Sequence, residues 1–221
     1  MDFIKYKIKS NFSYTSGFEI NSGIVYNALS DSNLMLRSFP ENLYKTIDLK
    51  TTSAIIGAIF CSSLANRAEG AIVNPIEKGN PDVVPEKAKN ATEEQLREYP
   101  EGVEIKCTAG NIKTGIKLRA GQQRFPSLTG ITWQAHHQEG KSILGLVWDF
   151  FQPSKNKSFL LPGISAAFFS SNLNKSDWGA ISGTTGRNTK VCGMTSSGKE
   201  KMKNGWIVIN DSFFERYIKL L

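Results

Sequence analysis

The chain has 221 residues, which suits one compact domain, and 40% of them are hydrophobic, enough to bury a sizeable core. Its formal net charge of +7 and its pI near 9.3 indicate an acidic partner. Nucleic acid fits this charge better than a membrane surface does, because no amphipathic basic helix stands out. The three cysteines are widely spaced and form no C-x-x-C pair, which argues against a disulfide framework and a structural zinc site.

The sequence gives no sign of a membrane or secretory segment. Residues 1–5 lack the apolar core of a signal peptide, and the most apolar stretch, residues 53–65, is too short and too rich in serine to span a bilayer. We therefore expect a cytoplasmic protein that does not bind membranes.

The first half of the chain predicts one long helix and two short strands. Residues 1–50 mix aromatic and polar residues without a strong period, and all that we expect of them is that they include helix and loop. Residues 51–68 carry apolar side chains at helical spacing, which predicts a largely buried helix against a sheet. Residues 81–84 read as the start of a strand, because proline is tolerated at a strand's first residue. Residues 92–95 fit a capping box, which predicts a short helix before the next strand.

The second half predicts the rest of the sheet. The run at residues 142–150 is almost entirely apolar and is typical of a central strand, and residues 164–171 and 206–209 favour two more strands. Asp211 and Ser212 are suitable caps for a last helix. Together these elements predict a single α/β domain, a mixed β-sheet flanked by helices, over residues 1–221.

Two acids and a lysine stand at positions that a sheet would bring together. Val103, Ile105 and Cys107 alternate with Glu104 and Lys106, which predicts a strand on which Glu104 and Lys106 project to the same side. The other acid, Asp82, precedes Glu104 by 22 residues and lies at the start of the strand that begins near residue 81. If the two strands pair, the three side chains converge at one edge of the sheet.

These residue types match metal-dependent phosphodiester cleavage. Mg²⁺ prefers oxygen ligands and is usually held by one or two carboxylates, here those of Asp82 and Glu104, and the backbone carbonyl of Ile105 is a further candidate ligand. Lys106 would orient the attacking water and stabilise the developing negative charge. The competing interpretation makes Glu104 and Lys106 part of a solvated strand face, but the added Pro-Asp pair favours the catalytic one.

The pattern Pro81-Asp82 followed by Glu104-Ile105-Lys106 resembles the PD-(D/E)XK nuclease superfamily and, within it, the type II restriction endonucleases. The wider segment from residue 79 through residue 137 resembles the ApaLI-like restriction enzymes. The resemblance implies a restriction-endonuclease-like fold, a homodimer and Mg²⁺ dependence. It also implies hydrolysis of double-stranded DNA at a short palindrome that leaves 5′-phosphates, and a cognate DNA methyltransferase as biological partner. Members often carry another acid on a preceding helix, for which Glu69 and Glu77 are both candidates.

Two other motifs are weaker. Residues 193–200 nearly spell a phosphate-binding loop, but Glu200 stands where a metal-binding Ser or Thr is required. His136 and His137 are adjacent, so they face different directions and have no carboxylate partner at ligand spacing, which favours a structural or DNA-contacting role.

Candidate DNA contacts lie in the C-terminal part of the chain. The glycine-rich stretch at residues 183–190 contains Arg187 and Asn188, which can read guanine or adenine in the major groove, and Lys190, which suits a phosphate. Lys199 lies in a similar but weaker stretch. An ordinary turn explains residues 183–190 equally well.

The leading hypothesis is a homodimeric type II restriction endonuclease, because a two-fold protein matches a palindromic site. Two alternatives stay open. One is another nuclease of the same superfamily, for repair or junction resolution, and the other is a basic DNA-binding protein without catalysis.

Overall fold

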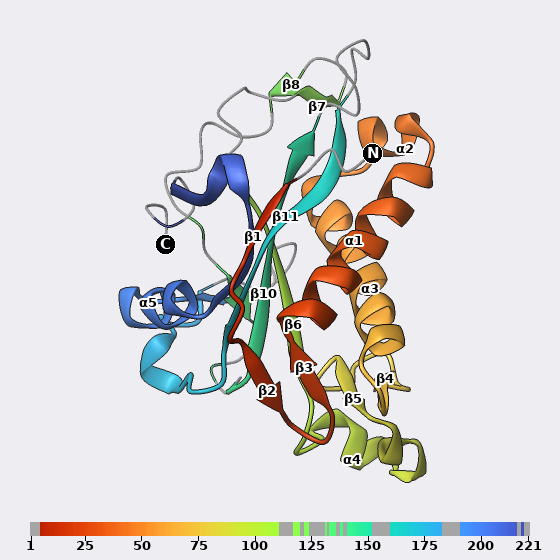
Figure 1. Ribbon diagram of the computed structural model, residues 1–221, viewed down its shortest axis with the longest axis vertical. Helices are drawn as coiled ribbons and strands as arrows, with labels where there is room; N and C mark the ends of the chain where they lie inside the picture. The colour runs from red at the N-terminus through yellow and green to blue at the C-terminus, as the bar shows by residue number, and fades with distance from the viewer. Residues whose placement is uncertain are drawn as a thin grey trace.

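The computed structural model describes residues 5–110, 117–119, 122–123, 131, 133–135, 138, 141–151, 160–182, 191–215 and 218. Its centre is a mixed sheet of five strands in the order β1, β13, β11, β10, β6 (Figure 1). Their bounds are Tyr6–Ile8, Trp206–Asn210, Leu161–Ser170, Ile143–Phe151 and Glu104–Ala109. β6 runs parallel to β10, and the other neighbours are antiparallel. The α/β class with a mixed sheet is therefore confirmed.

Helices cover both faces of this sheet (Figure 1). On one face lie α1 (Ser22–Ser38) and α3 (Leu49–Arg67), whose first turns are capped by the side chains of Asn21 and Asp48. They form one core cluster with alternate residues of the strands, such as Leu144 and Trp148 on β10. On the other face lies α5 (Ser196–Asn204), whose Met202 joins Ile143 and Val147 in a second cluster. The side chains of β10 thus alternate between two cores, as a strand buried on both faces requires.

Short elements complete the described chain. Two-stranded pairs are formed by β2 (Ser13–Thr15) with β3 (Glu19–Asn21), β4 (Ala71–Val73) with β5 (Val83–Pro85), β7 (Lys117–Arg119) with β8 (Gln122–Gln123), and β9 (Gln134–Ala135) with β12 (Cys192–Gly193). The short helices are α2 (Glu41–Thr46) and α4 (Glu93–Arg97), and the 3₁₀ turns are Glu86–Asn90, Lys175–Asp177 and Asp211–Phe213. None of the helices in the described residues is long and apolar enough to cross a bilayer.

Most of the predicted elements are confirmed. The buried helix is α3, which begins at Leu49, two residues before the predicted start, and the strands predicted at residues 142–150, 164–171 and 206–209 are β10, β11 and β13. Thr92 and Gln95 form the predicted capping box of α4.

The two ends of the chain contain elements that the sequence did not predict. Residues 1–50 contain three strands besides their helices, and one of them, β1, is an edge of the main sheet. Strands of three residues are too short to show an alternating pattern, so periodicity does not reveal them. At the other end of the chain, the side chain of Asn210 caps a 3₁₀ turn by accepting from the Ser212 amide, and much of the last helix predicted after Asp211 and Ser212 lies outside the described residues.

Candidate active site

The segment that carries Asp82 meets the strand that carries Glu104 at a single bridge. Val83 and Val103 exchange two backbone hydrogen bonds of 3.2 and 2.9 Å, although β5 itself pairs with β4 and not with the main sheet. Gly102 makes this approach possible, because its φ is +131° and a Cβ there would lie 2.3 Å from the Val83 carbonyl oxygen. The chain therefore leaves after Asp82, forms α4, and returns to place Glu104 beside it, as the sequence predicted.

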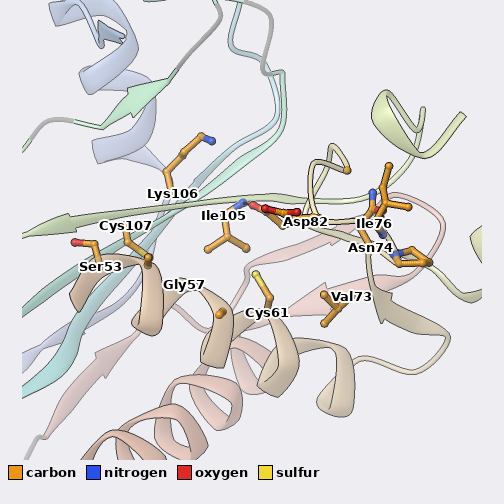
Figure 2. Close-up of a pocket in the computed structure, with 15 residues that line it drawn as sticks. Ser53, Gly57, Cys61, Val73, Asn74, Ile76, Asp82, Ile105, Lys106 and Cys107 are labelled. Carbon is orange, nitrogen blue, oxygen red and sulfur yellow. Dashed lines mark hydrogen bonds between the residues drawn. The ribbon is translucent and has the colours of Figure 1, made fainter. Parts of the chain in front are cut away.

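Asp82 reaches the free edge of β6. The Glu104 amide donates to the Ser142 carbonyl next to β10, so the peptide group of the following residue, Ile105, points away from the sheet. The Asp82 carboxylate accepts a hydrogen bond of 2.8 Å from the Ile105 amide (Figure 2). Because the amide and carbonyl of one strand residue project to the same side, the Ile105 carbonyl shares this edge with the carboxylate.

Glu104 and Lys106 form an ion pair on one face of β6. Their Oε1 and Nζ atoms are 2.5 Å apart, and the side chains are only 11% and 20% exposed. Figure 2 shows Lys106 pointing away from α3. The second carboxylate oxygen of Glu104, Oε2, is buried, and no amide, ammonium or hydroxyl group in the described residues donates to it, while the Asp82 carboxyl group shares a side-chain hydrogen bond with Glu104. This burial contradicts the interpretation of Glu104 and Lys106 as a solvated strand face.

The surroundings of Asp82 favour its protonated form. Its pKa is raised from the usual 3.8 to about 7: burial is the largest cause, the charge of Glu104 and a side-chain hydrogen bond with Glu104 act in the same direction, and the Ile105 amide and Lys106 counteract part of the effect. Two carboxylates sharing a buried site resist carrying two negative charges at once. A bound cation would remove that conflict.

The donor set fits Mg²⁺. Two carboxylates, one with an unpartnered buried oxygen, and a backbone carbonyl on the same edge are the few protein ligands that this ion uses while it keeps several waters and substrate oxygens. A complete cage is not present: no group of three or more His, Cys, Asp or Glu side chains in the described part of the chain could hold a metal.

A pocket of about 650 Å³ opens beside these residues (Figure 2). Asp82, Ile105 and Lys106 line one side of it. The opposing side is formed by small side chains of α3, among them Ser53 and Gly57, and by the segment after β4, residues 73–79. Small residues on α3 leave room between the helix and β6, so the pocket gives access to Asp82 and Lys106, whereas Glu104 does not line it.

The pocket distinguishes between the two candidates for an additional acid. Glu77 lines it, whereas Glu69 does not. Neither lies on a helix: Glu69 follows α3 in a turn, and Glu77 lies in the turn between β4 and β5.

The two cysteines in the pocket are poor nucleophiles. Burial raises the pKa of Cys107 to about 12 and raises that of Cys61 well above its ordinary value, and the negative charge of Asp82 acts in the same direction on both. Both side chains therefore stay protonated near neutral pH, and thiolate chemistry is not expected here.

The predicted DNA contacts are only partly described. Arg187, Asn188 and Lys190 lie outside the described residues, as do His136 and His137. Lys199 lies on α5, on the sheet face opposite α3. That is the face toward which Lys106 points (Figure 2). Its role as a DNA contact stays a prediction.

The near-match to a phosphate-binding loop has a structural explanation. Thr195 caps α5, and Gly198 is needed because a Cβ there would lie 2.6 Å from the Asp177 carbonyl oxygen. The Asp177 carboxylate accepts hydrogen bonds from Ser197 and Lys201. A carboxylate already occupies the start of this helix, where a phosphate would have to bind.

No protein-family model matches the chain, and no curated protein sequence matches it significantly.

Proposed function

We propose that the protein is a Mg²⁺-dependent endonuclease of the type II restriction kind, which hydrolyses double-stranded DNA at a short palindromic site and leaves 5′-phosphates. The observation that carries the proposal is the closeness of two carboxyl groups at the edge of β6, the buried Glu104 and the half-buried Asp82, which share a side-chain hydrogen bond. A protein gains nothing in stability from placing a buried and a half-buried carboxylate where they repel each other, so a ligand role explains Glu104 and Asp82 better than a structural one.

The residues divide the chemistry between them. Asp82, Glu104 and the Ile105 carbonyl would hold the ion, which supplies polarisation of the phosphoryl oxygen and a lower pKa for an attacking water. Lys106, held by Glu104, would orient that water and stabilise the negative charge that develops on the phosphate. The Ile105 amide fixes the Asp82 carboxylate, so the geometry is set before substrate binds.

The remaining parts of the proposal concern partners. A net charge of +7 suits the phosphate backbone of DNA. A homodimer in which each subunit cuts one strand would match the two-fold symmetry of a palindrome, with Arg187, Asn188, Lys190 and Lys199 contacting DNA. Such an enzyme works in the cytoplasm together with a DNA methyltransferase that protects the same sites.

The test is to incubate the purified protein with unmethylated phage DNA, with and without Mg²⁺. Discrete fragments that form only with Mg²⁺ would support the proposal, and sequencing their ends gives the site and the 5′-phosphate. Lys106→Ala is expected to lose cleavage. Lys89→Ala, which removes the same charge from an exposed pair with Glu86, is the matched control and is expected to cleave normally.

The outcomes separate the alternatives. Preferential cleavage of branched DNA, without sequence preference in duplexes, would favour a junction-resolving or repair nuclease. DNA that stays intact but is retarded in a gel would favour a binding protein without catalysis. Full cleavage by Lys106→Ala would show that the catalytic assignment is wrong.

A further inference from the structure

Asn74 is a buried polar residue that the sequence did not single out. It follows β4 directly, is 9% exposed and lines the pocket. Its side-chain amide donates hydrogen bonds of 3.0 Å to two carbonyls, those of Pro81 and Leu96, and its side-chain oxygen accepts one of 3.2 Å from the Ile76 amide. One asparagine thus joins the end of β4, the end of α4 and the segment that carries Asp82.

Asn74 holds the peptide groups on both sides of Asp82. Its side chain binds the Pro81 carbonyl, and its own backbone amide donates a hydrogen bond of 2.8 Å to the Asp82 carbonyl. Gly79 leaves room for the Asn74 side chain, because a Cβ at residue 79 would lie 2.1 Å from it. Figure 2 shows Asn74 and Asp82 on neighbouring segments, with Asp82 at Ile105.

We propose that Asn74 is a positioning residue: by fixing the carbonyls of Pro81 and Asp82 it holds the Asp82 carboxylate at the Ile105 amide and beside Glu104. As a statement about metal binding and cleavage, this inference rests on the proposed function. As a statement about where Asp82 lies, it does not. Because the side-chain amide and oxygen of Asn74 are both engaged by protein backbone groups, its effect on chemistry passes through Asp82.

The chain offers a matched control in Asn33. This residue is also buried, at 5% exposure, and its side chain also makes three hydrogen bonds, two with the Ile164 backbone and one with the Tyr6 hydroxyl. Asn33→Ala removes comparable bonds from a contact between α1 and the strands, away from Asp82. A general loss of stability therefore affects both variants, whereas a change at Asp82 is specific to Asn74→Ala.

The first readout is amide hydrogen exchange by NMR, without metal or DNA. The Ile105 amide is held by Asp82, and the neighbouring Glu104 amide is held by the Ser142 carbonyl, so their exchange ratio reports the position of Asp82 within one strand. In Asn74→Ala the Ile105 amide is expected to exchange faster relative to Glu104 by about tenfold or more, and in Asn33→Ala the ratio should stay at its wild-type value. An unchanged ratio in a folded Asn74→Ala protein would overturn the proposal.

A second variant guards against a failure to fold. Gly79→Ala keeps Asn74 but places a methyl group on its side chain, and it is expected to raise the same exchange ratio. If this folded variant keeps the wild-type ratio while Asn74→Ala does not fold, the proposal is also overturned.

The second readout is Mn²⁺ binding to the protein alone, followed by electron paramagnetic resonance, with single-turnover DNA cleavage beside it. Asn74→Ala is expected to weaken Mn²⁺ binding and slow cleavage by about tenfold to a hundredfold, the usual range for residues that orient a metal ligand. Asn33→Ala should resemble the wild type in both. Cleavage by Asn74→Ala at the wild-type rate would contradict the role in chemistry. A wild type that does not cleave DNA would refute the proposed function, while the exchange ratio would still decide whether Asn74 positions Asp82.

Discussion

The buried acid pair predicts that replacing Asp82 by asparagine makes the protein more stable at high pH. The pKa of Asp82 is about 7 in the folded protein and 3.8 as the ordinary value, chiefly because of burial and then because of Glu104. A raised pKa means that the folded state binds the proton more tightly than the unfolded state. The resulting stabilisation is fully present below pH 3.8, decreases as the pH rises, and is lost above pH 7.

The magnitude follows from the difference between the two pKa values. Each pKa unit is worth about 1.4 kcal/mol, so the gap between 3.8 and 7 amounts to about 4 kcal/mol as an upper value. Asp82→Asn is neutral at every pH and keeps an oxygen for the Ile105 amide. Its free energy of unfolding relative to the wild type should therefore increase by up to about 4 kcal/mol between pH 4 and pH 8, or roughly 10 °C in the thermal midpoint.

The assay is thermal or urea unfolding of both proteins across that pH range without divalent ions. Asp177→Asn is the control, because Asp177 is a fully buried carboxyl group with a lowered pKa: burial raises it, and hydrogen bonds from Lys201, Ser197 and the Asn174 amide outweigh burial. Its loss should destabilise the protein, and more so at pH 8 than at pH 4. A difference between Asp82→Asn and the wild type that stays constant with pH, or grows toward pH 4, would refute the reasoning.

Three further predictions follow from the same geometry. At pH 8, Mg²⁺ at a hundred times its dissociation constant should raise the free energy of unfolding of the wild type by about 2.7 kcal/mol and leave that of Asp82→Asn unchanged. Equal stabilisation of the two proteins would place the ion elsewhere. Lys106→Ala should slow single-turnover cleavage roughly a hundredfold or more while DNA affinity without metal persists, and parallel losses of both would make Lys106 a binding residue. Gly145→Ala should lower the free energy of unfolding by about 1–3 kcal/mol, because its Cβ would lie 2.6 Å from Trp133. Gly193→Ala is the control and should be nearly neutral, because a Cβ there would meet no atom within 4 Å. Similar losses of stability in the two variants would contradict the packing around Gly145.

The main features of the site could be predicted from local patterns. Alternation along residues 103–107 was enough to place Glu104 and Lys106 on the same side of a strand, and the Pro-Asp pair was enough to place Asp82 at the start of another. The capping box of α4 explained how the chain fills the interval. These features depend on neighbours within a few residues, which is the range that a sequence pattern reports.

The rest depends on contacts between distant segments. β1 pairs with β13, about two hundred residues later in the chain, and no pattern in residues 6–8 predicts that pairing. The bond between Asp82 and the Ile105 amide exists because β6 is an edge strand, a property of the whole sheet order. The role of Asn74 also depends on distant contacts, because the fold brings the carbonyls of Pro81 and Leu96 to its side chain. In sequence it only precedes Pro75, a pair that is typical of a turn.

The most direct test of the central claim is the Mg²⁺-dependent cleavage of unmethylated phage DNA by the wild type and by Glu104→Gln. Glutamine keeps the size of the side chain and removes the negative charge that would bind the metal ion and that pairs with Lys106. The account predicts discrete fragments from the wild type with Mg²⁺, none without it, and none from a folded Glu104→Gln protein. Cleavage by Glu104→Gln at the wild-type rate, or equal cleavage with and without Mg²⁺, would contradict it.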